Sequence, residues 1–229
     1  MLPKLVDELS PRFTVYNYDR RGRGDSTDTQ PYAVEREIED LQALIAEAGG
    51  TADVWGMSSG AVLSLRAAAA DIGIRKLAAY QPPFRVDAST PLPPADFEQH
   101  LNDLVAAGRR GEAVKYMMTK GMGAPGFVVG IMRLLPLWQR LTRVAHTLPY
   151  DVAIVGDTVY GKPLSADDWA GVKVPTLAMA GGKAPEILRT AAKQLAEVLP
   201  DGRYRVLEGQ SHNVSPKVLA AVLTEFFQS

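Results

Sequence analysis

Ser58 stands in the segment Gly56-Met57-Ser58-Ser59-Gly60, where a glycine lies two residues to each side of a serine. An apolar segment, residues 52–56, precedes this turn, and a small-residue segment, 61–70, follows it. Such a strand–turn–helix setting is required to lift a serine hydroxyl above the end of a strand, with glycines where side chains would collide with backbone. We therefore predict that Ser58 is a nucleophile. The N–H of Ser59, at the start of the helix, would stabilise negative charge developing on a substrate oxygen.

His212 is the predicted base for this serine, because a serine hydroxyl is a weak nucleophile until a base removes its proton. The chain has three histidines. His212 follows a predicted strand at 203–207, and in a parallel sheet that loop lies at the same carboxyl edge as the serine turn. His100 and His146 fall in predicted helices, where we expect them to be surface or packing residues.

The elements that would position these residues alternate between helix and strand at both ends of the chain. Helices are predicted at 2–9, 31–48, 61–70, 185–199 and 216–227, and strands at 13–18, 52–56, 76–80, 174–180 and 203–207. This order predicts an α/β fold with a mostly parallel sheet and helices on both faces. The middle of the chain has helical periodicity, with helices predicted near 96–107, 110–119, 126–146 and 149–156. We therefore predict a core formed by residues 1–83 and 165–229 and a helical cap at 84–164.

Composition excludes several classes of function. The 229 residues, 46% of them hydrophobic, suit one domain with a substantial core. The net charge of −1 gives no indication of a nucleic-acid partner, and no apolar stretch is long enough to predict a membrane span. The absence of cysteine excludes disulfides and cysteine-based metal sites, and we expect a cytoplasmic protein. The basic run Arg20-Arg21-Gly22-Arg23 is interpreted as a solvated turn.

Residues 18–26 read Tyr-Asp-Arg-Arg-Gly-Arg-Gly-Asp-Ser and look like the D-x-R-G-x-G-x-S turn common among α/β-hydrolases. Together with the Ser58 turn, the segment 174–177 and the His212 loop, this likeness covers nearly the whole chain. The sequence resembles the bacterial α/β-hydrolase-1 group of esterase-like proteins. The resemblance implies a Ser–acid–His hydrolase that needs no metal or organic cofactor. Serine at the turn argues against haloalkane dehalogenases and epoxide hydrolases, which resemble this fold but carry aspartate there.

The acid that orients the histidine is not determined by the sequence. In most of the family it is an aspartate shortly after the strand that here spans 174–180, but this loop contains none. Asp157, at the end of a predicted helix, is the first candidate, since a triad is defined by geometry rather than by chain position. Glu186 is the alternative acid, Asp151 is a weaker candidate, and another acid or none remains open.

The resemblance also implies three strands ahead of the helix at 2–9, one of them lying between the strands at 13–18 and 52–56. We therefore expect an N-terminally short form. Its sheet would either have a gap or pair those two strands directly, and an exposed edge would invite homodimerisation. A second oxyanion donor would be missing as well, and loss of such a donor costs on the order of 100-fold to 1000-fold in rate.

Two functions from different classes follow. The leading hypothesis is a serine hydrolase that forms an acyl-enzyme with a small carboxylic ester or related acyl substrate. An apolar pocket would be offered by cap residues Met117, Met118, Phe127, Ile131, Met132, Leu134 and Trp138. The alternative is a catalytically weak or inactive protein of the same fold that binds a small apolar ligand or a partner chain. A lyase or another cofactor-free reaction on the same residues is a third hypothesis.

Overall fold

The computed structural model describes residues 2–87 and 91–229, so Met1 of the predicted core and residues 88–90 of the predicted cap lie outside the described residues. Within these ranges the sheet has four strands in the order β1-β2-β3-β4, and every neighbouring pair is parallel. The strands are β1 (Ala52–Met57), β2 (Ile74–Tyr80), β3 (Thr176–Gly181) and β4 (Gly202–Leu207). The prediction of a parallel α/β fold is thereby confirmed.

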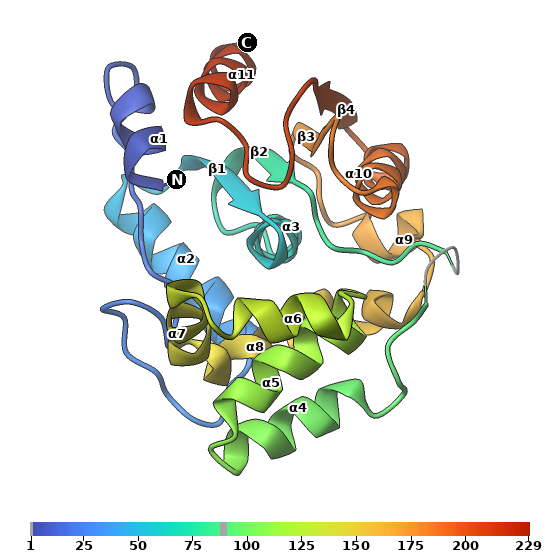
Figure 1. The fold of residues 1–229 in the computed structure, drawn as a ribbon. Helices are drawn as coiled ribbons and strands as arrows, with labels where there is room; N and C mark the ends of the chain where they lie inside the picture. The colour runs from blue at the N-terminus through green and yellow to red at the C-terminus, as the bar shows by residue number, and fades with distance from the viewer. Residues whose placement is uncertain (1, 88–90) are drawn as a thin grey trace.

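Helices cover both faces of this sheet (Figure 1). One face packs on α1 (Leu2–Leu9) and α11 (Pro216–Gln228), and the other on α2 (Val34–Glu47), α3 (Ser59–Ala69) and α10 (Glu186–Val198). Successive side chains of β2 alternate between these two layers, as a strand buried on both faces requires. Leu77 and Ala79 join the layer of α3, whereas Ala78 and Tyr80 join the layer of α11.

The chain between β2 and β3 forms a helical insertion, which we define as the elements from α4 to α9. Its elements are α4 (Phe97–Ala106), α5 (Arg110–Tyr116), η1 (Met117–Gly121), α6 (Gly126–Met132), α7 (Pro136–Arg143), η2 (Ala145–Thr147), α8 (Leu148–Val155), η3 (Gly156–Tyr160) and α9 (Ala166–Trp169). It has a small core of its own, centred on Phe97, Leu101 and Val152. The prediction of one helix at 126–146 is wrong, because Pro136 lacks the N–H needed inside a helix and instead begins α7.

The prediction of a strand at 13–18 is also wrong, since these residues have irregular backbone. They lie across from β1, which is an edge strand of the sheet. A cavity of about 890 Å³ is lined by both segments together with parts of α1 and α2. We call this cavity the edge slot. Of the two expected arrangements, the structure has a gap between residues 13–18 and β1. Aromatic and β-branched residues favour a strand, but they cannot form a hydrogen-bonded ladder without a neighbouring strand about 4.8 Å away.

Gly56 lies where β1 leads into the turn before α3. A Cβ atom built on it would lie 2.4 Å from the carbonyl oxygen of Gly60 and 2.7 Å from Oγ of Ser64, so no side chain fits. A Cβ on Gly60 would meet no heavy atom within 4 Å. The expectation that backbone crowding requires both glycines is therefore confirmed for Gly56 and wrong for Gly60.

We predict that Gly56→Ala destabilises the protein by about 1–3 kcal/mol, because the added methyl overlaps backbone that cannot move independently. The matched variant Gly60→Ala should change the free energy of unfolding by less than about 1 kcal/mol, since the new side chain enters open space on a helix. Urea unfolding monitored by circular dichroism measures both. Equal losses in the two variants would contradict the prediction.

The backbone of β1 provides a second test. Within a parallel strand, alternate residues direct their N–H groups to opposite sides. The Ser58 N–H donates to the Tyr80 carbonyl on the β2 side. The backbone N–H of Gly56 therefore also points toward β2, whereas the N–H groups of Trp55 and Met57 point toward the edge slot.

We predict that the amides of Trp55 and Met57 exchange with deuterium on the order of tenfold faster, or more, than the amide of Gly56, because open backbone hydrogen bonds exchange readily. Residue-resolved exchange by NMR provides the comparison within one strand. Equal protection on both sides would show that another segment or a second copy pairs with this edge.

Candidate active site

Ser58 occupies a strained position between β1 and α3. Its backbone angles are φ 56° and ψ −130°, in a region that residues other than glycine rarely enter. Such a conformation costs about 1–3 kcal/mol and persists where surrounding structure enforces it. One enforcing contact is the Ser58 N–H, which donates to the carbonyl of Tyr80 at 2.9 Å. The turn thus lies at the carboxyl end of β1, directly beside the carboxyl end of β2.

Ser59 is the first residue of α3. The first N–H groups of a helix have no partner within the helix, and the helix dipole adds partial positive charge at this end. The predicted oxyanion donor therefore lies where backbone N–H groups can meet a negative oxygen. The side chain of Ser59 points elsewhere, since its hydroxyl accepts a hydrogen bond from Nη1 of Arg20 at 3.2 Å.

The carboxyl end of β2 connects the Ser58 turn with the His212 loop. The buried hydroxyl of Tyr80 donates to the carbonyl of Ser211 at 2.6 Å, and burial raises the pKa of Tyr80 to about 12. A Cβ on Gly181 would lie 2.4 Å from the carbonyl oxygen of Gln210, so glycine allows the loop to pack closely on β3. The loop of His212, the predicted base, therefore packs against β2. The same strand accepts the backbone hydrogen bond of Ser58, the predicted nucleophile.

His212 forms its side-chain hydrogen bond with Gln81, the residue that follows β2. The distance from His212 Nδ1 to Gln81 Oε1 is 2.6 Å. His212 is exposed at the surface, yet desolvation of its ring lowers its pKa below the ordinary value of 6.5. Sequence reasoning missed Gln81, because a carboxylate was expected in this place. The available signal was its position directly after a strand at the same sheet edge.

Neither of the two predicted acids is hydrogen-bonded to His212 within the described residues. Asp157 is an exposed residue of η3, and Glu186 is an exposed residue at the first position of α10. The ring nitrogen that either acid would need is hydrogen-bonded to Gln81. Asp151 is bound by two arginines, with its Oδ1 atom 3.1 Å from Nη1 of Arg20 and 2.8 Å from Nη2 of Arg23.

An ion-pair network lies on the other side of the Ser58 turn. Nε and Nη2 of Arg20 bind the two carboxylate oxygens of Glu37 at 2.6 and 2.7 Å, and the Glu37 side chain is only 2% exposed. Burial would raise the pKa of Asp151, but the charges of Arg23 and Arg20 and a hydrogen bond from Ser59 outweigh it and hold that pKa below its usual value. The interpretation of the basic run as a solvated turn is wrong for Arg20, which is 12% exposed.

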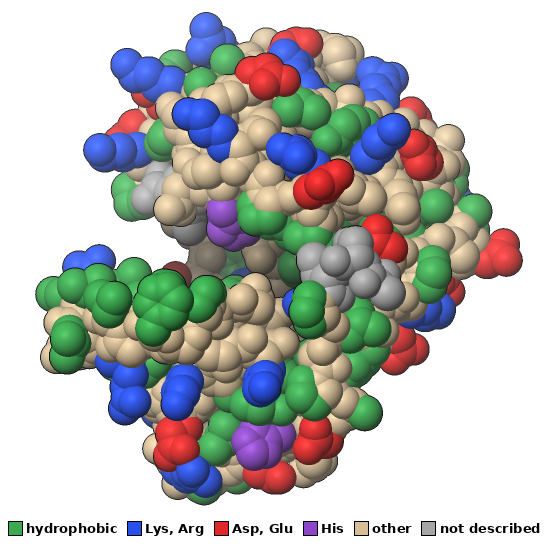
Figure 2. Space-filling model, turned by 45° about the vertical axis from the view of Figure 1, so that its right-hand side comes forward, with side chains coloured by type: hydrophobic (Ala, Val, Ile, Leu, Met, Phe, Trp, Pro, Cys, Tyr) green, Lys and Arg blue, Asp and Glu red, His purple; other side chains and the backbone are tan. Residues whose placement is uncertain are grey.

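A hollow separates the part of the molecule built on the sheet from the part built by the helical insertion, and hydrophobic side chains gather along the insertion's rim (Figure 2). The exposed large hydrophobic residues of α6, α7 and the adjoining turns form a patch that we call the insertion patch. It consists of Met122, Phe127, Val128, Ile131, Leu134, Leu135 and Leu137. An apolar surface is thus available on the segment where an apolar pocket was predicted.

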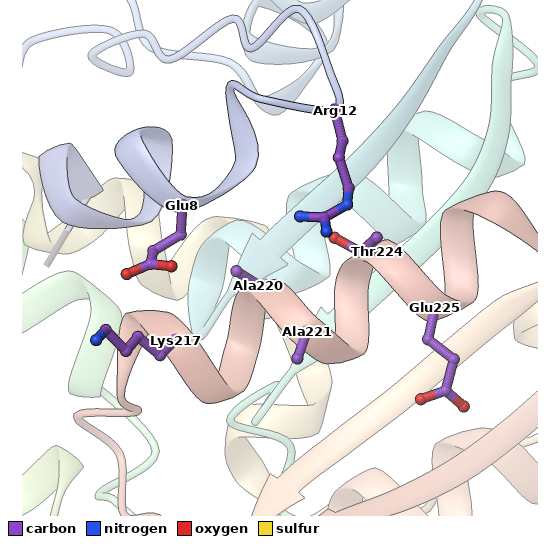
Figure 3. A pocket seen from close by; sticks show the side chains of 7 residues that line it. All are labelled: Glu8, Arg12, Lys217, Ala220, Ala221, Thr224 and Glu225. Atoms are coloured by element: carbon purple, nitrogen blue, oxygen red, sulfur yellow. The ribbon is translucent and has the colours of Figure 1, made fainter.

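A second hollow, of about 400 Å³, lies between α1 and α11 (Figure 3). Its lining includes the charged side chains of Glu8, Arg12, Lys217 and Glu225, and none of the candidate site residues belongs to it. Among the described residues, no group of three or more His, Cys, Asp or Glu is arranged to hold a metal ion. In the same part of the chain, no helix is both long and apolar enough to cross a membrane.

Comparison with solved structures gives a similar fold over nearly the full chain. The crystal structure of an alpha/beta hydrolase from Sphaerobacter thermophilus shares 51% sequence identity, with a TM-score of 0.89 over 98% of this chain and 86% of that chain. A thermophilic esterase from Thermogutta terrifontis matches at 18% identity, with a TM-score of 0.64 over 99% and 84%. A bromoperoxidase from Bacillus anthracis matches at 20% identity, with a TM-score of 0.64 over 100% and 85%.

These last two likenesses concern the fold alone, because their identity to this chain is low. Comparison with functionally curated proteins found no match. The sequence profile of the alpha/beta hydrolase family matches residues 2–222, which is nearly the whole chain. With the strained serine turn, the parallel sheet and the half-identical Sphaerobacter structure, this match shows that the chain belongs to the alpha/beta hydrolase family.

Proposed function

We propose that this protein is a serine hydrolase that acts on a carboxylic ester or a related acyl substrate. The observation that carries the proposal is the joint attachment of two loops to the end of β2. The backbone of Ser58 is hydrogen-bonded to Tyr80, and the ring of His212 is hydrogen-bonded to Gln81, the next residue. A candidate nucleophile and a candidate base are thus held at one edge of the sheet.

The chemistry follows from these positions. His212 removes the proton from the Ser58 hydroxyl, whose oxygen attacks the substrate carbonyl. The N–H of Ser59 stabilises the oxyanion that forms. His212 then gives its proton to the leaving alcohol, which leaves an acyl group on Ser58. Water, deprotonated by the same histidine, releases the acid and restores the enzyme.

The insertion patch supports a substrate with an apolar acyl or alcohol part. Phe127, Ile131 and Leu134 are 73%, 59% and 85% exposed, which is unusual for residues of this size. Contact with an apolar substrate group would remove part of this surface from water.

A second candidate function is supported by a separate observation. The hydrogen-bond partner of His212 is an uncharged amide instead of a carboxylate, and a triad without its charge is catalytically weaker. A protein of this fold that binds a small apolar ligand or a partner chain with little turnover is therefore the alternative. Reaction with an active-site probe separates the two functions.

We predict that a fluorophosphonate probe labels the native protein and that mass spectrometry locates the label on Ser58. Ser58→Ala should abolish labelling because the reacting oxygen is gone. Ser10→Ala, which changes an exposed serine after α1, is the matched control and should label as the native protein does. Folded native protein that stays unlabelled would contradict the hydrolase proposal and favour the binding protein.

We also predict the pH dependence of this labelling. The neutral form of His212 is the base, so the rate falls as the pH drops through the pKa of this histidine. Because desolvation lowers that pKa, the midpoint of the fall should lie below pH 6.5. Rates measured from about pH 4 to 8 at constant ionic strength test this, because histidine titrates within that range. A midpoint above 6.5 would contradict it and indicate an anionic partner for the ring.

A further inference from the structure

We propose that Gln81 is the positioning residue of His212, so that the site operates as a Ser58–His212–Gln81 arrangement with no charged third member. This inference rests on the proposed hydrolase function and deepens it. It assigns a role to a residue that carries no charge and that the sequence alone did not single out.

The contact itself determines what Gln81 can do. A side-chain carbonyl oxygen can only accept a hydrogen bond, so Oε1 of Gln81, 2.6 Å from Nδ1 of His212, requires the hydrogen to be on Nδ1. In a neutral imidazole the other nitrogen then has a free lone pair. Nε2 is left as the atom that accepts the proton of Ser58. Gln81 thus selects the tautomer that base catalysis needs.

Gln81 is held firmly enough to act in this way. Its side chain is fully buried, and its N–H donates to the carbonyl of Met179 on β3 at 2.8 Å. Its φ of 50° is in the left-handed region, as is that of Ser58. Two residues with strained backbone therefore lie at adjacent strand ends, and strain of this kind gathers at functional sites.

The amide nitrogen of Gln81 strengthens the argument. Nε2 is buried and has no hydrogen-bond partner among the described residues. An unpartnered buried N–H costs about 1–3 kcal/mol, whereas an aliphatic side chain of similar size would avoid that cost. Within the described part of the chain, the one polar contact of this side chain is the bond to His212. We infer that this contact is the reason for an amide at a fully buried position.

The consequence concerns charge. A carboxylate both orients the histidine and stabilises the imidazolium that forms, whereas an amide can only orient it. Ionisable groups on the elements around the His212 loop include Tyr80 on β2, Lys183 and Arg189 beyond β3, and Glu208 in the loop itself. Burial, and not one of these charges, is what lowers the pKa of His212. A carboxylate at position 81 would add the missing anionic partner.

The experiment compares the native protein with Gln81→Glu and Gln81→Leu, and uses Gln99→Glu on the exposed face of α4 as a matched control for added charge. Nitrogen-15 NMR reads the tautomer and the titration of His212, whose signals are assigned by their loss in His212→Asn. Fluorophosphonate labelling of Ser58 reads the rate. The NMR readout does not depend on activity.

In the native protein we expect the Nδ1–H tautomer. Gln81→Glu should raise the pKa of His212 by about one unit or more, since an anion then contacts the ring, and should keep Ser58 reactive. Gln81→Leu should remove the tautomer preference and slow labelling by about tenfold or more, because one oriented hydrogen bond is lost. Gln99→Glu should leave the titration of His212 as in the native protein.

The failures are distinguishable. A native protein that shows the Nδ1–H tautomer but never labels would overturn the proposed hydrolase function. A native protein that labels at Ser58 while Gln81→Leu labels equally fast would overturn the role of Gln81 alone. An Nε2–H tautomer in the native protein would also overturn it, because the amide would then be donating to the ring. If Gln81→Leu does not fold, an unchanged pKa of His212 in Gln81→Glu would likewise overturn the role of Gln81.

Discussion

The carboxyl end of β2 is the constraint on which the candidate site depends. Within two residues it accepts the backbone N–H of Ser58, donates the Tyr80 hydroxyl to Ser211 and presents the Gln81 amide to His212. The Gln81 N–H in turn bonds to Met179 on β3, so the strand end is fixed from the sheet side. Two loops that lie far apart in the sequence are thus hydrogen-bonded to the same rigid strand end. A catalytic site needs this kind of rigidity to keep its side chains in position.

The opposite side of the Ser58 turn is held by charge. Among the described residues, no strand pairs with the outer edge of β1, and the edge slot lies there instead. Arg20 stabilises the turn on this side in place of a neighbouring strand. Its guanidinium binds Glu37 of α2, Asp151 of α8 and the hydroxyl of Ser59. Two-pronged binding of Arg20 to a carboxylate that is 2% exposed is strong and directional. The turn is therefore fixed by backbone bonds on one side and by ion pairs on the other.

Features that depend on local pattern could be predicted from the sequence, and features that depend on distant contacts could not. The turn around Ser58, the alternating elements and the parallel sheet follow from spacing and residue type. The failed strand at 13–18 had the right residues but lacks a neighbour to pair with. Arg20 looked solvated because its partners are 17 and 131 residues away. Gln81 escaped notice for the same reason, since His212 is 131 residues further along the chain.

An uncharged amide at position 81 agrees with the pairing of Glu37, the buried carboxylate that has a cation against it. A buried charge is costly unless it is paired. Glu37, the buried carboxylate of α2, has the guanidinium of Arg20 against it. Position 81 is also fully buried, but its polar contact is a histidine whose pKa is lowered by desolvation. A glutamate there would lack a permanent cation, whereas a glutamine keeps the same acceptor geometry without the charge. Under the proposed function, the site would give up stabilisation of the imidazolium and retain the orientation of His212.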